Sequence, residues 1–169
     1  MKKILSILVR NRPGVLSHVA GLVTRRGYNV ESIAAGPTEN QAVTRITLVV
    51  SGDGAMLDQV AKQVGKLVDV ISLEDLPLEE AMTGELAIIT VNVDRGRRAE
   101  MLNLINLLGL TLTDIRDDSL SVMAAGTAKS VHMAITGLQP FGIRALARTG
   151  LVALSRPGDP MATGQEDEQ

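Results

Sequence analysis

The sequence contains no cysteine and no tryptophan, and it has only one tyrosine, Tyr28, and one phenylalanine, Phe141. The lack of cysteine excludes disulfides and thiolate metal sites. The scarcity of aromatic rings argues against nucleic-acid-binding modules that stack bases on aromatic side chains. The core must therefore be built from Leu, Ile, Val, Ala and Met.

The chain also lacks an excess of positive charge. Its 17 basic and 19 acidic residues leave a formal net charge of −2, without a basic stripe, so a nucleic acid is not an expected partner. The two histidines, His18 and His132, lie far apart in the sequence, and we expect no metal site.

No long hydrophobic run is present. The apolar run near the N-terminus covers residues 4–9, too short for a signal peptide or for the roughly 20 residues of a membrane span. We therefore expect no membrane association and a cytoplasmic location.

The order of predicted elements in the first half is β-α-β-β-α-β, the ferredoxin-like pattern. Apolar residues at helical spacing predict helices, and β-rich runs between turn residues predict strands. The predicted strands cover residues 4–10, 29–35, 43–50 and 68–73, and the predicted helices cover 15–26 and 56–67.

The same order recurs in the second half. Strands are predicted at residues 86–93, 110–116, 120–125, 143–148 and 151–155, and helices at 98–108 and 131–138. Residues 131–135 would also fit a strand, and the helix is preferred. The two halves align at an offset of 82 residues, with Ile7 matching Ile89, Val9 matching Val91, Gly14 matching Gly96 and Val19 matching Met101.

The fold class is therefore predicted as α+β, with two ferredoxin-like βαββαβ modules. We predict a first domain at residues 1–75, a linker at 76–84, a second domain at 85–156 and a disordered tail at 157–169. Each sheet would leave one face and its edges uncovered by helices, which favours self-association.

The stretch NRPGVLSHVAGLVTRRGYNVESI, residues 11–33, is the strongest candidate for a site. Its loop lies between a strand and a helix N-terminus, where free N–H groups suit a carboxylate. Amide side chains can serve an ammonium or a carboxylate, and aliphatic neighbours can form a wall. These features describe a receptor for a small aliphatic amino acid, with the candidate residues Asn11, Pro13, Gly14, Val15, Leu16, Asn29, Val30 and Ile33.

An ordinary strand-to-helix turn is the alternative reading of this loop. The repeat favours a site, because Gly14 keeps a glycine partner in Gly96 whereas Asn11 is replaced by Val93 and Asn29 by Thr111. Elsewhere, the adjacent Asp117 and Asp118 have the composition of a hairpin turn. No nucleophile with a base and an orienting group can be assembled, so we expect no catalytic residues and a binding or regulatory role.

The segments NRPGVLSHVAGLVTRRGYNVESIAAGPTE, QVAKQVGKLVDV and PFGIRALARTGLVALSR resemble the small, regulatory subunits of acetohydroxyacid synthase (acetolactate synthase). The resemblance covers about residues 1–157, and its first part resembles an ACT domain.

This resemblance implies a non-catalytic chain that binds and activates a catalytic subunit and confers feedback inhibition by valine, or by leucine or isoleucine. No cofactor is expected in this chain; thiamine diphosphate, Mg²⁺ and FAD would belong to the catalytic subunit. ACT domains pair as homodimers with the amino acid between protomers, so the loop at Asn11 would come from one protomer and Asn29 from the other. A stand-alone amino-acid sensor is the alternative function.

Overall fold

The computed structural model describes residues 1–25 and 29–156, which form two compact units. The N-terminal unit contains Met1–Thr83 and the described residues from Leu151 onward. The C-terminal unit contains Gly84–Gly150. The predicted tail at 157–169 lies outside the described residues.

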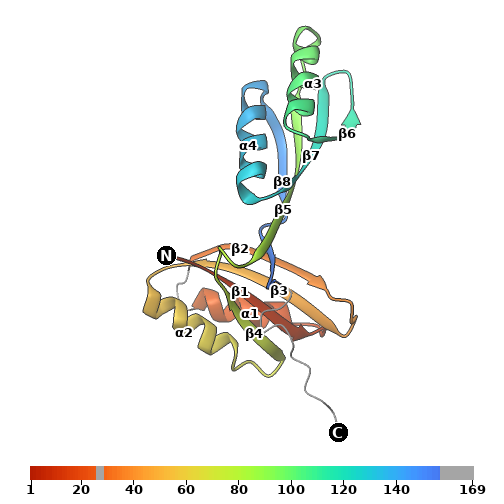
Figure 1. The fold of residues 1–169 in the computed structure, drawn as a ribbon. Coiled ribbons are helices and arrows are strands. Elements are labelled where there is room, and N and C mark those ends of the chain that lie inside the picture. Colours follow the sequence, from red (N-terminus) through yellow and green to blue (C-terminus); the bar gives the residue numbers. More distant parts are fainter. Residues whose placement is uncertain (26–28, 157–169) are drawn as a thin grey trace. The chain divides into compact units, whose positions relative to one another are not determined.

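The N-terminal unit is a βαββαβ module with a four-stranded antiparallel sheet in the order β2-β3-β1-β4 (Figure 1). Its elements are β1 (Lys2–Arg10), α1 (Val15–Arg25), β2 (Asn29–Pro37), β3 (Val43–Ser51), α2 (Gly54–Val64) and β4 (Val70–Leu76). The alternating side chains of β1 place Leu5, Ile7 and Val9 in a core with both helices. The carboxylate of Asp53 starts α2 by accepting a hydrogen bond from the Met56 N–H at 2.8 Å.

The opposite face of this sheet is partly covered by residues 151–156, which we call the C-terminal segment. It contains the short strand β9 (Val152–Leu154). The Leu151 N–H donates to Ser32 Oγ at 3.4 Å, and the Ala153 N–H donates to Thr47 Oγ1 at 3.3 Å. Ala153 joins a second hydrophobic cluster of this unit with Ile4, Val49, Leu76 and Ala81. Both faces of the sheet therefore bury apolar surface.

The C-terminal unit repeats the βαββαβ order, and its antiparallel strands follow the order β6-β7-β5-β8. Its elements are β5 (Met82–Asn92), α3 (Arg98–Leu107), β6 (Thr111–Ile115), β7 (Ser119–Gly126), α4 (Ala128–Leu138) and β8 (Ile143–Arg148), with short 3₁₀ turns η1 (Arg95–Arg97) and η2 (Gln139–Phe141). The helix predicted at 131–138 is confirmed as α4, which the Thr127 hydroxyl starts by accepting from the Ser130 N–H. The predicted α+β class with two ferredoxin-like modules is confirmed.

The two copies of the repeat agree in the burial of their matched core residues but differ in backbone conformation at one matched glycine. Ile7 and Ile89 are both fully buried, as are Val19 and Met101. Gly14 adopts a left-handed φ of +87°, whereas Gly96 is not among the glycines with positive φ and lies within η1. The matched glycines therefore do not share a backbone conformation, and the comparison of the two copies gives no support to a site at Asn11.

The division of the chain also differs from the predicted one. The prediction placed residues up to 156 in the second domain, whereas the C-terminal segment belongs to the N-terminal unit. The strand predicted at 68–73 runs from Val70 to Leu76, and β5 begins at Met82, which shortens the connection between them. Sequence pattern alone cannot show which of two similar sheets a short apolar strand will cover.

The burial of Ala153 leads to a test of the C-terminal segment. Ala153→Asp places a carboxylate where the side chain is 3% exposed, and we expect it to lower the free energy of unfolding by about 2–4 kcal/mol. Urea unfolding followed by circular dichroism measures this loss. Val152→Asp is the matched control, because Val152 is the neighbouring residue and is 50% exposed. Equal losses in both variants would contradict the packing described.

Candidate functional site

The loop before α1 is anchored by Asn11. Its backbone N–H donates to the Ala42 carbonyl at 2.7 Å, and its Nδ2 donates to the Gln41 carbonyl at 2.9 Å. These bonds hold the loop against the turn between β2 and β3. Among the described residues, none donates a hydrogen bond to Asn11 Oδ1, which leaves an acceptor for a ligand. Gly14 completes the turn in a conformation that strains any residue with a Cβ.

The predicted apolar wall is largely part of the core. Val15 is 5% exposed, and Val30 and Ile33 are half-buried against the same core cluster. Leu16 is 45% exposed and is the residue of this group that offers apolar surface to a ligand or partner. Pro13, in the same loop, is also exposed.

Asn29 lies at the other end of the sheet. It begins β2, opposite Ser51, and its Nδ2 donates to Ser51 Oγ at 3.0 Å. Asn11 follows Arg10, which pairs with Val43 at the opposite end of β3. The eight steps of β3 between Val43 and Ser51 span about 26 Å. One chain therefore does not bring Asn11 and Asn29 together around a single small ligand.

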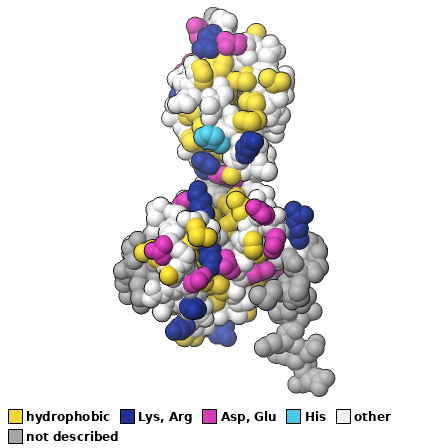
Figure 2. All heavy atoms as spheres, turned by 60° about the vertical axis from the view of Figure 1, so that its left-hand side comes forward, with side chains coloured by type: hydrophobic (Ala, Val, Ile, Leu, Met, Phe, Trp, Pro, Cys, Tyr) yellow, Lys and Arg dark blue, Asp and Glu magenta, His cyan; other side chains and the backbone are white. Residues whose placement is uncertain are grey.

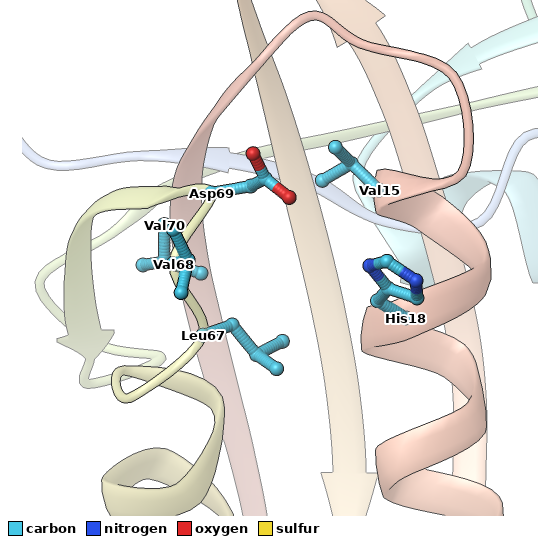
Figure 3. A pocket seen from close by; sticks show the side chains of 6 residues that line it. All are labelled: Val15, His18, Leu67, Val68, Asp69 and Val70. Atoms are coloured by element: carbon cyan, nitrogen blue, oxygen red, sulfur yellow. The ribbon is translucent and has the colours of Figure 1, made fainter.

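A pocket that the sequence did not indicate lies near the same loop (Figure 3). Its volume is about 200 Å³, and it opens between α1 and the connection from α2 to β4. The lining residues are Val15, His18, Leu67, Val68, Asp69 and Val70. Figure 3 shows the Asp69 carboxylate and the His18 imidazole on opposite sides of this pocket. Only Val15 among them was a predicted site residue. His18 lies three residues after it in the same stretch, whereas residues 67–70 lie some 50 residues further along the chain and carry no motif.

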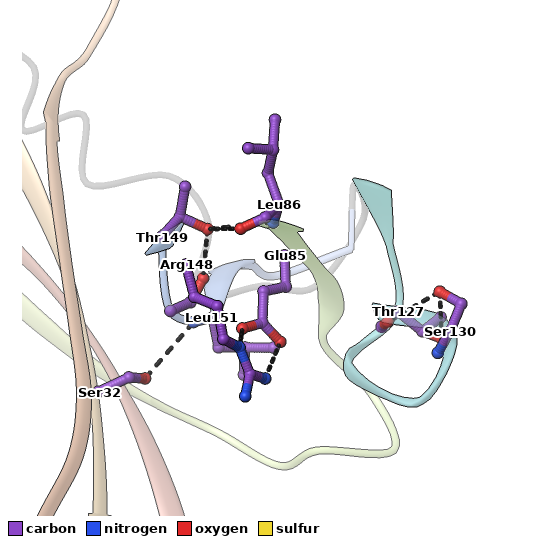
Figure 4. A network of polar contacts seen from close by, with 9 residues as sticks. Ser32, Glu85, Leu86, Thr127, Ser130, Arg148, Thr149 and Leu151 are labelled. Carbon is purple, nitrogen blue, oxygen red and sulfur yellow. Dashed lines mark hydrogen bonds and ion pairs between the residues drawn. The ribbon is translucent and has the colours of Figure 1, made fainter. Parts of the chain in front are cut away.

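Among the described residues, the most deeply buried carboxylate belongs to an ion pair of the C-terminal unit. Glu85 has a side chain only 4% exposed, and both its oxygens accept hydrogen bonds from Arg148 at 2.7 and 2.9 Å (Figure 4). The hydrogen bonds that Arg148 donates to Glu85 raise the pKa of Arg148 above its ordinary value. A carboxylate held in this bidentate way has a structural partner and is not arranged as a free base.

Metal-binding clusters and membrane-spanning helices are both absent among residues 1–25 and 29–156. No group of three or more His, Asp or Glu side chains is placed there to hold a metal ion. In the same residues, no helix has the length and apolar character needed to cross a membrane. On the face of the N-terminal unit in Figure 2, basic and acidic side chains alternate. The turn residue Asp118 accepts from Arg144 at 2.8 Å, and this bond lowers the pKa of Asp118.

Comparison with known proteins identifies both modules. Residues 5–72 match the family described as the AHAS small subunit-like ACT domain, and residues 84–157 match the family described as the small subunit of acetolactate synthase. The chain belongs to the family of small, regulatory subunits of acetolactate synthase. The resemblance noted in the sequence is thereby confirmed.

Individual members of the family match over almost their full lengths. The acetolactate synthase small subunit of Mycobacterium bovis is 41% identical over 152 residues, which cover 90% of each chain. A probable acetolactate synthase small subunit of Archaeoglobus fulgidus is 38% identical over 92% of this chain and 98% of its own. The crystal structure of the small subunit from Thermotoga maritima matches with a TM-score of 0.85 at 32% identity, over 92% of this chain and 98% of that one.

The Glu85–Arg148 pair supplies a test of its structural role in this small subunit. Arg148→Ala leaves the Glu85 carboxylate without its partner, and we expect a loss of about 2–3 kcal/mol in unfolding free energy. The 42% exposure of Arg148 keeps the loss below that of a fully buried pair, because water can reach Glu85.

Urea unfolding measures this loss, and two variants serve as controls. Replacing both partners, as Glu85→Met with Arg148→Leu, should recover most of it, because no unpaired charge remains. Arg116→Ala, which breaks the exposed pair with Asp114, should change nothing measurable. An unchanged unfolding midpoint for Arg148→Ala would show that the pair has no structural role.

Proposed function

We propose that this chain binds and activates the catalytic subunit of acetolactate synthase and makes that enzyme sensitive to valine, or to leucine or isoleucine. The catalytic subunit would carry thiamine diphosphate, Mg²⁺ and FAD, and the complex would act in the cytoplasm. Membership in the small-subunit family supports the partnership, and the ACT-like fold of residues 5–72 supports amino-acid binding.

The position of β2 is the observation that carries the proposal for the effector site. β2 is an edge strand of the N-terminal sheet and, among the strands that the structure describes, pairs only with β3. If β2 pairs antiparallel with β2 of a second copy about a two-fold axis, the start of one strand meets the end of the other. Asn29 of one protomer would then lie beside Pro37 of its partner, at the sheet end where Asn11 is anchored. A homodimer therefore unites two groups of residues that one chain keeps apart.

The chemistry at that junction suits a branched-chain amino acid. The first N–H groups of α1 can receive the carboxylate, and the unused Asn11 Oδ1 can accept from the ammonium. Leu16 is exposed there and offers apolar surface to the aliphatic side chain. Because the ligand would contact both protomers, it would stabilise one dimer arrangement over another, with a coupling of about 1–3 kcal/mol.

The partnership is tested by titrating the chain into the catalytic subunit of the same organism. We expect the rate of acetolactate formation to rise about 5-fold or more, as a coupling in this range allows. Valine should then lower that rate only when the chain is present. An unchanged rate together with no co-elution in gel filtration would overturn the proposal. If valine still bound to the isolated chain, that result would favour a stand-alone sensor.

Substitutions at the two ends of the sheet test the effector site. Asn29→His and Gly14→Asp should abolish inhibition by valine while leaving activation intact, because they alter the ligand contacts and not the core. Asn29 is exposed, so its replacement carries no folding cost from burial. Gly14→Asp also strains the backbone at φ +87°, and its thermal midpoint should be compared with that of the parent chain.

Matched changes in the C-terminal unit provide the controls. Asn103→His replaces an exposed asparagine on α3, and Gly96→Asp replaces the glycine aligned with Gly14. Both should leave the valine titration of the reconstituted enzyme unchanged. A normal valine response in Asn29→His and Gly14→Asp would remove the site assignment and leave the activating role standing.

A further inference from the structure

The pocket beside α1 combines aliphatic walls with an unpaired negative charge. Val15, Leu67 and Val70 come from the core side, and Asp69 contributes its carboxylate (Figure 3). Within the described part of the chain, the Asp69 side chain makes no hydrogen bond or ion pair, although it is half-buried. Its backbone is held in place, because the Asp69 carbonyl accepts from the Arg10 N–H at 2.9 Å. The Asp69 carboxylate is therefore held in position by its backbone, is partly shielded from water and is available to bind a cationic partner.

The rim of the pocket exposes apolar surface that none of the described residues of the N-terminal unit covers. Val68 is 88% exposed, the same fraction as the N-terminal Met1, although Val68 lies in the middle of a folded module. Ile71, which follows on the edge strand β4, is 53% exposed. An apolar rim around a charged group is typical of a surface that becomes buried on association.

The volume and the lining residues of the pocket indicate what kind of group it can bind. A volume of about 200 Å³ is smaller than the roughly 300–1,000 Å³ of most small-molecule sites and suits one long side chain. The methylene groups of a lysine or arginine can pack on Val15, Leu67 and Val70 while the cationic head meets Asp69. His18 adds a hydrogen-bonding group on the facing wall.

The pocket is also separate from the surfaces already assigned in this unit. The edge at β2 is opposite to β4 in the sheet order, and the face away from the helices carries the C-terminal segment. At the same time, Val15 lines the pocket and directly follows Gly14 of the effector loop. A conformational change in that loop would therefore shift Val15 and alter the shape of the pocket.

We propose that this pocket is a docking site for the catalytic subunit, occupied by a basic side chain of that subunit with its apolar neighbours on Val68. This inference rests on the proposed activating function. It places the partner on the β4 side of the N-terminal unit, and it makes Val15 the link between effector binding and the partner contact.

Two substitutions test the docking site in the complete chain with the complete catalytic subunit. Asp69→Asn removes the charge, and Val68→Ser removes the apolar rim at a position too exposed to affect folding. Each should raise the concentration of chain needed for half-maximal activation about 10-fold, which is the scale of losing one well-desolvated contact. Maximal activation and the valine response at saturation should stay as in the parent chain.

Salt dependence separates a direct contact from a change in structure. Activation by the parent chain should weaken as NaCl increases, and this dependence should be smaller in Asp69→Asn, because the ionic contact is gone. Asp117→Asn, an exposed turn aspartate of the C-terminal unit, and Leu78→Ser, a 66% exposed apolar residue, are the matched controls. Both should activate like the parent chain.

The outcomes distinguish this inference from the proposed function. If the parent chain activates and both Asp69→Asn and Val68→Ser activate equally well, the docking site is overturned and the function stands. If the parent chain does not activate, the proposed function itself fails. If the two substitutions change only the dimer dissociation constant, the occupant is a second copy of this chain and the inference is overturned.

Discussion

A four-stranded sheet with helices on one face must still cover its other face, and the N-terminal unit meets this constraint with a segment from far along the chain. Ala153 and Leu151 join Ile4, Val49 and Leu76 behind the sheet. Hydrogen bonds to Ser32 and Thr47 fix the position of the segment. The module that carries the proposed effector loop is therefore discontinuous in sequence, and a truncation after Thr83 would remove part of its own core.

This cover leaves the sheet edges as the remaining places for main-chain pairing. β2 and β4 form the two edges, and the proposed contacts divide between them. In the proposed homodimer, the β2 edge would pair with a second copy, and a two-fold axis there would bring Asn11 and Asn29 to one sheet end. Next to the β4 edge, the pocket at Asp69 suits a basic side chain. One module can thus hold an effector and a partner on different sides, with Val15 between them.

Much of the fold followed from residue pattern. The period of apolar residues predicted the βαββαβ order twice, and buried pairs such as Ile7 with Ile89 bear out the repeat. Boundaries were less certain, since β4 continues three residues beyond its predicted end at Leu73. The alignment of Gly14 with Gly96 suggested a shared turn that the structure does not have, because two glycines at matched positions can adopt different φ angles. The pocket carried no sequence signal, since α1 and residues 67–70 meet only in the folded module.

The sequence by itself determined the fold class, the duplicated module and the family, because all three depend on local periodicity and on motifs contiguous along the chain. The tertiary structure alone decided three further matters. It assigned residues 151–156 to the N-terminal unit, separated Asn11 from Asn29 by the length of a strand, and brought Asp69 to the side of Val15. Each of these depends on contacts between residues far apart in the chain, and local pattern does not encode the distance between such residues.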